Sequence, residues 1–213
     1  MFLKRILDSE KDSSIKIIGI GDVGCIVVNK LYESGCKYHT IAINPDMRDA
    51  IGIPDTKLIV GINSNNGLGC RANQQLAQKC FDESIKELDS IIRDNSNDIS
   101  GKNRAKKYIL VGSLSSTCFF VGIKYLIDII NKIGDSKIYV VSSDSSDFEG
   151  DIRKILREKC ISMINDYKQN NYLEEVKIVN SHERNNNIDY YDILNNKMIN
   201  EIFLLAVNKN QKA

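Results

Sequence analysis

The stretch IKIIGIGDVGCIVVNKL, residues 15–31, decides the fold. It opens with a continuous apolar run over residues 15–20, rich in isoleucine, which is typical of a buried strand in a parallel sheet. Gly19, Gly21 and Gly24 follow in the pattern G-x-G-x-x-G, and residues 25–34 then predict a helix that ends at Gly35. A strand, a glycine turn and a helix in this order favour a phosphate ligand, because free N–H groups gather at the helix start.

Composition excludes several classes of function. The 213 residues carry 29 basic and 28 acidic side chains, so charge gives no sign of a nucleic-acid partner. We find no signal peptide and no run of about 18 to 20 apolar residues that would span a membrane, and we expect a cytoplasmic protein. The six cysteines form no C-x-x-C pair, so we expect reduced thiols and no metal site.

Strands and helices alternate along the rest of the chain. This alternation predicts an α/β fold, a three-layer, doubly wound and mostly parallel sheet. We expect residues 1–14 to be an N-terminal tail and residues 15–213 to form one nucleotide-binding domain. The predicted strands are 15–20, 40–44, 57–61, 108–112, 137–142 and 176–180, and the predicted helices are 25–34, 74–94, 117–133, 151–167 and 189–207.

Ligands of such sheets bind at the carboxyl ends of the strands, so the loops there hold the candidate residues. Asn44 precedes Pro45 and Asp46, and an acid about 20 residues past the glycines also suits the ribose of a dinucleotide. An NAD-type dinucleotide-binding domain is therefore an alternative, although no general acid or base for hydride transfer stands out.

The loop after the predicted strand 108–112 is rich in hydroxyl side chains. Gly112, Ser115, Ser116 and Thr117 precede an apolar helix, where they can donate to a phosphate or serve only as an N-cap. Further along, Glu149 and Arg153 stand four residues apart, which is the spacing of a shared helix face or of a simple ion pair.

Taken in order, these loops resemble the nucleotide-binding domain of the FtsZ/tubulin family. AINPD, residues 42–46, resembles the family's A-I-N-T-D, and NGLGCRAN, residues 66–73, resembles its R-G-L-G-A-G-A-N. FEG, residues 148–150, resembles the segment that carries the family's ribose-contacting pair. NKMINEIFLLAV, residues 196–207, resembles its central helix, with Asn196 at the base-stacking position and Asn200 at the guanine-reading position.

The resemblance implies GTP or GDP as the ligand, with Mg²⁺ as its companion ion, and a protein related to filament-forming GTPases of the cytoskeleton and cell division. A further copy of this chain or a filament-forming relative is the implied protein partner. We assign no catalytic residue. The implied nucleotide-binding residues are Gly19, Gly21, Asp22, Gly24, Cys25, Asn44, Gly112, Ser115, Ser116, Thr117, Glu149, Arg153, Asn196 and Asn200.

The sequence also departs from the family pattern. LSSTCFF, residues 114–120, stands where the family has G-G-G-T-G-T-G, and Phe119 and Phe120 would crowd a phosphate if they faced it. Asp22, Val23 and Cys25 replace glycines of the first loop. The chain stops inside the family's central helix, so we expect no second domain and no acidic catalytic loop. Little GTP hydrolysis by this chain alone follows, and the alternative is an FtsZ-like scaffold or modulator that binds no nucleotide.

Overall fold

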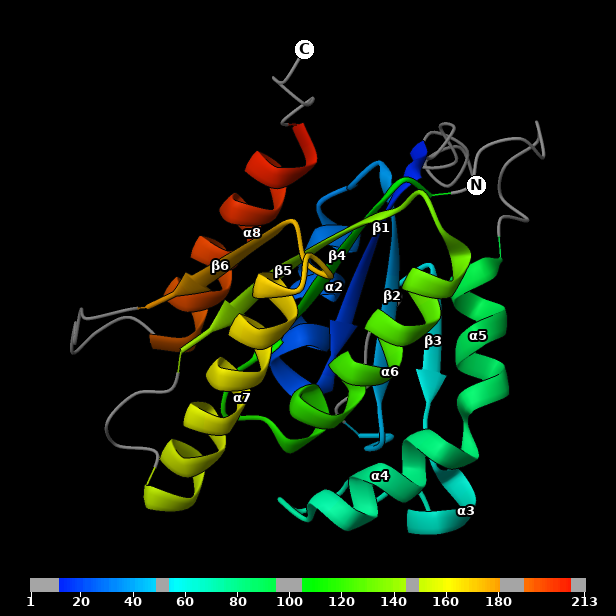
Figure 1. The fold of residues 1–213 in the computed structure, drawn as a ribbon, viewed down its shortest axis with the longest axis vertical. Helices are drawn as coiled ribbons and strands as arrows, with labels where there is room; N and C mark the ends of the chain where they lie inside the picture. The colour runs from blue at the N-terminus through cyan, green and yellow to red at the C-terminus, as the bar shows by residue number, and fades with distance from the viewer. Residues whose placement is uncertain (1–11, 49–53, 95–104, 145–149, 181–189, 208–213) are drawn as a thin grey trace.

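Six parallel strands form the centre of the fold, in the order β3-β2-β1-β4-β5-β6 (Figure 1). The computed structural model describes residues 12–48, 54–94, 105–144, 150–180 and 190–207. The chain winds outward in both directions from β1 and β4, so the point where the strand order reverses lies between these two strands. The strands are β1 (Asp12–Ile20), β2 (Tyr38–Asn44), β3 (Thr56–Ile59), β4 (Lys107–Ser113), β5 (Lys137–Ser143) and β6 (Glu175–Val179).

Helices cover both faces of this sheet, which confirms the predicted three-layer α/β fold (Figure 1). One apolar core lies between the sheet and α4, α5, α6 and α7, and a second lies between the sheet and α2 and α8. Within the described residues, no helix is long and apolar enough to cross a membrane. The helices are α2 (Gly21–Glu33), α3 (Ile62–Asn65), α4 (Gln74–Glu83), α5 (Ile85–Arg93), α6 (Thr117–Ile133), α7 (Asp151–Gln169) and α8 (Tyr190–Val207).

The predicted strands and helices differ most from the structure at three places. Strand β1 begins at Asp12, where the backbone N–H donates to the carbonyl of Lys37 at 2.8 Å. The predicted helix 74–94 is two helices, because the chain turns at Ser84 and the Ser84 hydroxyl accepts a hydrogen bond from the N–H of Gly61 at 3.0 Å. The predicted helix 25–34 begins already at Gly21, so residues 22–24 form its first turn rather than a loop.

Two glycines of the first motif bring backbone segments into direct contact. A Cβ on Gly19 would lie 2.2 Å from the carbonyl oxygen of Gly24, and a Cβ on Gly24 would lie 2.4 Å from the carbonyl oxygen of Val111. Helix α2 therefore packs closely on β1 and β4 only because both residues lack a side chain. Packing accounts for Gly19 and Gly24 without a ligand.

Phe119 is part of the core and does not face the candidate phosphate loop. Its ring is fully buried, and a Cβ on Gly112 would lie 2.1 Å from the ring carbon Cδ2. Gly112 thus provides the space into which Phe119 packs. Phe120 is half-buried under the ammonium of Lys124, which lies 4.2 Å from the ring centroid. The two aromatic residues of this loop leave the space above it open.

Candidate functional site

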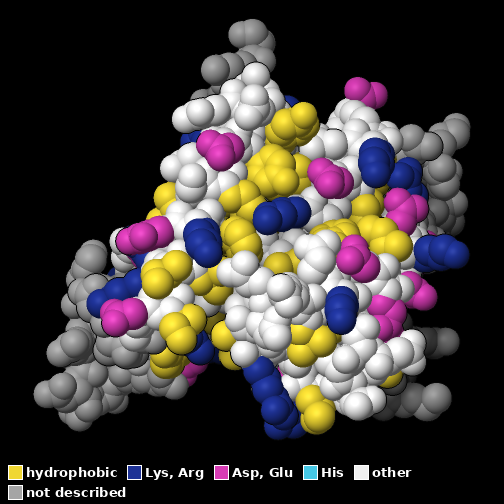
Figure 2. Space-filling model, turned by 60° about the horizontal axis from the view of Figure 1, so that its bottom comes forward, with side chains coloured by type: hydrophobic (Ala, Val, Ile, Leu, Met, Phe, Trp, Pro, Cys, Tyr) yellow, Lys and Arg dark blue, Asp and Glu magenta, His cyan; other side chains and the backbone are white. Residues whose placement is uncertain are grey.

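A cavity of about 330 Å³ opens at the carboxyl ends of the strands, beside the point where the strand order reverses. Figure 2 turns this end of the molecule toward the viewer, and basic, acidic and hydrophobic side chains are interspersed over it. Side chains from the starts of α2 and α6 and from the ends of β2 and β5 line the cavity, together with the loop before α4 and parts of α7 and α8. The parallel topology brings all of these segments to one edge of the sheet.

Helix α2 presents its first turn to the cavity. Its N-cap residue, Ile20, offers no side-chain hydrogen bond, and Gly21 enters the helix with φ of 70°. Asp22 lies in the first turn, where the positive end of the helix dipole stabilises a carboxylate. Its Oδ1 accepts a hydrogen bond of 3.0 Å from Nδ2 of Asn44, at the end of β2.

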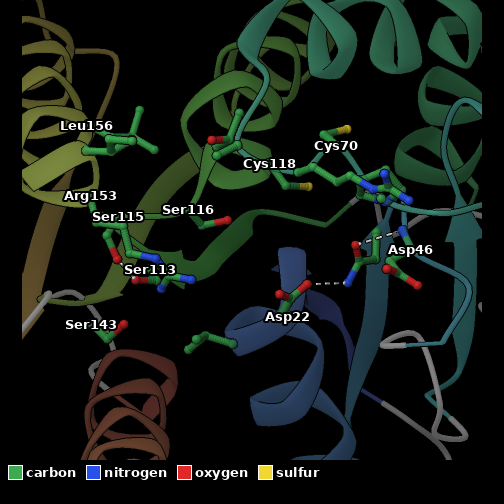
Figure 3. A pocket seen from close by; sticks show the side chains of 18 of the residues that line it. Asp22, Asp46, Cys70, Ser113, Ser115, Ser116, Cys118, Ser143, Arg153 and Leu156 are labelled. Atoms are coloured by element: carbon green, nitrogen blue, oxygen red, sulfur yellow. Dashed lines mark hydrogen bonds between the residues drawn. The ribbon is translucent and has the colours of Figure 1, made fainter. Parts of the chain in front are cut away.

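Helix α6 presents a turn of hydroxyl side chains. Ser116 caps the helix, because its Oγ accepts from the N–H of Phe119 at 3.3 Å. Ser115 and Ser116 at the start of α6 and Asp22 at the start of α2 face the same space (Figure 3). Thr117 and Ser143 are 7% and 2% exposed, and their hydroxyls have no hydrogen-bond partner among the described residues. Both line the cavity, so both hydroxyls are available to a ligand.

Most carboxylates around the cavity are already paired with arginine. Asp46 accepts two hydrogen bonds from the Arg48 guanidinium, 3.0 Å from Nε and 2.7 Å from Nη2. Asp144 is held by both Nε and Nη2 of Arg157. The carboxylate of Asp22 contacts an amide instead, so it is the acidic group of the lining with no arginine partner among the described residues.

The loop before α4 closes one end of the cavity with an unusual backbone. Leu68 forms an isolated antiparallel bridge to Asp46, and the N–H of Met47 donates to the carbonyl of Gly67 at 3.0 Å. These bonds hold the loop against the end of β2. Five residues of the loop adopt positive φ, namely Asn66, Gly67, Gly69, Arg71 and Ala72.

The opposite end of the cavity carries most of its aliphatic and aromatic side chains. Ile152 and Leu156 reach it from α7, and Tyr191 and Leu194 reach it from α8. Arg153 lies between the two α7 residues and lines the same space. The cavity is therefore amphipathic, with helix N-termini and hydroxyls at one end and aliphatic and aromatic groups at the other.

Buried thiols lie beneath the polar end. Cys70 and Cys118 line the cavity, and Sγ of Cys70 lies 3.8 Å from Sγ of Cys80. Burial raises the pKa of Cys70 to about 12, and it raises the pKa of Cys118 well above its ordinary value. Both thiols are consequently neutral near pH 7 and add no negative charge beside a bound anion.

Comparison with known proteins gives both sequence and structural relatives, although no protein-family model matches the chain. The cell division protein FtsZ 1 of Pyrococcus abyssi is 32% identical over 88 residues, which are 40% of this chain and 23% of that protein. FtsZ of Aquifex aeolicus is 32% identical over 83 residues, 38% of this chain and 22% of that protein. The matched part thus spans about a quarter of these curated relatives.

Solved structures extend the likeness to the whole fold. An empty FtsZ dimer from M. jannaschii superposes with a TM-score of 0.75 at 18% identity, covering 100% of this chain and 60% of that one. The chain has the FtsZ/tubulin-like fold. CetZ2 from Haloferax volcanii, in a GTPgS-bound protofilament, has a TM-score of 0.75 at 17% identity over 90% of this chain and 57% of that one. TubZ of Clostridium botulinum phage c-st has a TM-score of 0.68 at 11% identity, covering 93% of this chain and 61% of that one.

The cavity brings together some of the residues that the sequence predicted, and others lie outside it. Glu149 lies outside the described residues. Asn196 and Asn200 are on the exposed face of α8, away from the face that bears Leu194. Gly19, Gly21, Gly24, Cys25 and Gly112 lie beside or beneath the cavity and are not part of its lining. The predicted residues that do line it are Asp22, Asn44, Ser115, Ser116, Thr117 and Arg153.

Sequence reasoning missed three kinds of lining residue. Ser143 is the last residue of β5, and its position at a strand end was the available signal. Tyr191 supplies an aromatic ring from the first turn of α8. The family pattern instead predicts the base-stacking position at Asn196, five residues later. Arg71 stands in NGLGCRAN at a position where the family pattern has glycine, and this departure was visible in the sequence.

Proposed function

We propose that this FtsZ-like protein binds a guanine nucleotide in the cavity at the carboxyl ends of the strands. The amphipathic lining carries the proposal. A nucleotide has a polyanionic end and a flat, largely apolar base. The cavity has a volume of about 330 Å³ and offers a matching polar end and apolar end. Pockets of roughly this size bind small ligands and cofactors.

The phosphates are assigned to the end formed by α2 and α6. Free N–H groups and the positive dipole ends of both helices converge there, and the Thr117 hydroxyl adds a donor. A phosphate beside Asp22 is repelled by its carboxylate unless a cation lies between them. Asp22 is therefore the residue that would hold Mg²⁺ when a magnesium–nucleotide complex binds.

The base is assigned to the apolar end between α7 and α8. Tyr191 and Leu194 supply an aromatic and an aliphatic surface for stacking. The preference for guanine is supported by the likeness to FtsZ and to CetZ proteins solved with GTPgS and GDP. Asn200 remains the proposed guanine-reading residue by resemblance alone, since it lies on the exposed face of α8 and outside the cavity lining.

Hydrolysis by this chain is proposed to be slow. Phosphoryl transfer depends on positioning and charge stabilisation, and the glycines of the family's central signature are replaced by the side chains of residues 114–120. Assembly with a second copy or with a filament-forming relative is proposed from the FtsZ, CetZ and TubZ structures, which include dimers and protofilaments. Sedimentation with and without GTP tests that assembly. The location that we propose for the protein is the cytoplasm.

The nucleotide that the purified protein carries tests the proposal. Protein prepared without added nucleotide is denatured, and the supernatant is resolved by ion-exchange chromatography beside calorimetric titrations with GTP, GDP, ATP and NAD. We expect guanine nucleotide in the supernatant, or selective binding of GTP and GDP. Absence of all four at millimolar concentration would instead favour a scaffold that retains the fold without the ligand.

A further inference from the structure

Arg71 occupies a backbone position that suits glycine better than arginine. Its φ is 47° and that of the following residue, Ala72, is 60°, both in the left-handed region that a Cβ disfavours. Gly69, two residues earlier, has φ of 74°. A strained backbone that the surrounding bonds keep in place is a reason to ask what the side chain does.

Arg71 lines the cavity, and its guanidinium is available to a ligand. The residue is exposed, and it forms no hydrogen bond or ion pair with any other described residue. Arg48, which lines the same end of the cavity, is bound to Asp46 through Nε and Nη2 of its guanidinium. The guanidinium of Arg71 is thus the available planar, five-donor cation at the polar end.

The surrounding groups point to an anion with several oxygens. The first turn of α6 and the unpartnered hydroxyls of the buried residues Thr117 and Ser143 offer donors to the same cavity. Asp22 and Arg71 introduce opposite charges at positions where the family pattern has glycine. A phosphate chain bridged to Asp22 by a divalent cation would need a second positive group, and a guanidinium binds phosphate through two parallel hydrogen bonds.

We propose that Arg71 binds the phosphate chain of the nucleotide directly, and that its guanidinium adds donors to those of the first turn of α6. This inference rests on the proposed nucleotide function and adds a residue and a charge to it. It predicts that affinity depends on the number of phosphates: strong for Mg²⁺–GTP, weaker for GMP.

Glycine substitution tests the proposal without threatening the fold. Arg71→Gly removes the guanidinium and relieves the left-handed strain, so the melting temperature should stay the same or rise. Its affinity for Mg²⁺–GTP should fall at least about tenfold, the scale of one lost charge-assisted contact. The affinity for GMP should change less, and Arg71→Lys should lie between the wild type and Arg71→Gly.

Ala72→Gly is the matched control. It introduces glycine into the same loop, at a residue that also has positive φ, without removing a charge. It should leave the affinity for Mg²⁺–GTP unchanged. Equal losses in Arg71→Gly and Ala72→Gly would overturn the proposal, since loop flexibility would then explain both. Wild-type affinity in Arg71→Gly would overturn it while leaving the nucleotide function intact, whereas no GTP binding by the wild type would reject both.

Discussion

Lys16 is a single buried charge that joins β1 to the end of α5. Its side chain is 2% exposed, and its ammonium donates to the carbonyls of Ile92 at 2.8 Å and Ile91 at 3.3 Å, and also to that of Asp94. These carbonyls are among those left without partners at a helix C-terminus. Burial lowers the pKa of Lys16 to about 8, and the nearby Asp94 carboxylate partly opposes this shift.

This pKa predicts a pH-dependent stability. The pKa of Lys16 is about 8 in the folded protein and 10.5 in the unfolded chain, so between these pH values the unfolded chain binds more protons. The free energy of unfolding contributed by Lys16 therefore rises as pH increases from about 8 toward 10.5. Chemical denaturation of wild type and Lys16→Met across this range should give a difference that grows in favour of the wild type. A constant or shrinking difference would contradict the assignment.

The close contact between Gly112 and Phe119 predicts that a larger residue at position 112 destabilises the protein. Gly112→Ala places a Cβ 2.1 Å from the buried ring and should destabilise the protein by about 1–3 kcal/mol, measured by denaturant unfolding. Adding Phe119→Ala removes the ring, including the Cδ2, Cγ and Cε2 atoms that lie nearest to the new Cβ. If overpacking is the cause, the double variant should lose less than the sum of the two single losses. Additive losses would argue against a direct clash.

Single residues were also the hardest level to predict. The pattern G-x-G-x-x-G predicts a phosphate site, but Gly19 and Gly24 are needed for backbone packing whether or not a ligand binds. The sequence cannot separate these roles, because both demand the absence of a Cβ. Phe119 shows the converse case: its position in a candidate phosphate loop suggested obstruction, and its burial depends on Gly112, seven residues earlier in the chain.

At the scale of elements, hydrophobic periodicity predicted where strands and helices occur but not how they break. Helix α6 matches the predicted range 117–133 because its apolar pattern and its ends are encoded locally. The break at Ser84 was missed, because the hydrogen bond from Gly61 to the Ser84 hydroxyl joins residues 23 positions apart. Apolar positions on both sides of the break remain in helical register, so periodicity alone predicted one helix.

Capping of α4 gives a prediction for this scale. Oδ1 of Asn73 accepts from the N–H of Leu76 at 3.0 Å, so Asn73→Ala should lower the free energy of unfolding by about 1 kcal/mol. Asn73→Asp retains an acceptor and should lose little. Ser90→Ala, an exposed change within α5, is the control and should be neutral or slightly stabilising. Thermal or denaturant unfolding of the three variants measures the differences, and an Asn73→Ala loss no larger than the control's would refute the capping role.

At the scale of the whole molecule, the parallel topology of the sheet brings most of the site residues to one edge. The order of predicted strands and helices was enough to place the cavity at the carboxyl ends of the strands, and Asp22, Asn44 and Thr117 meet there. The apolar end was not predicted. Tyr191 and Leu156 come from helices far along the chain, and only tertiary packing brings their side chains to one space.

The proposed nucleotide places its phosphates at the first turns of α2 and α6. Titration of ¹⁵N-labelled protein with Mg²⁺–GDP, followed by backbone amide resonances, tests it most directly. We predict large shifts for the amides of Asp22, Val23, Thr117 and Cys118, and unchanged resonances for Ile85–Arg93 of α5. No shift at millimolar nucleotide, or shifts confined to segments outside the cavity, would contradict the account.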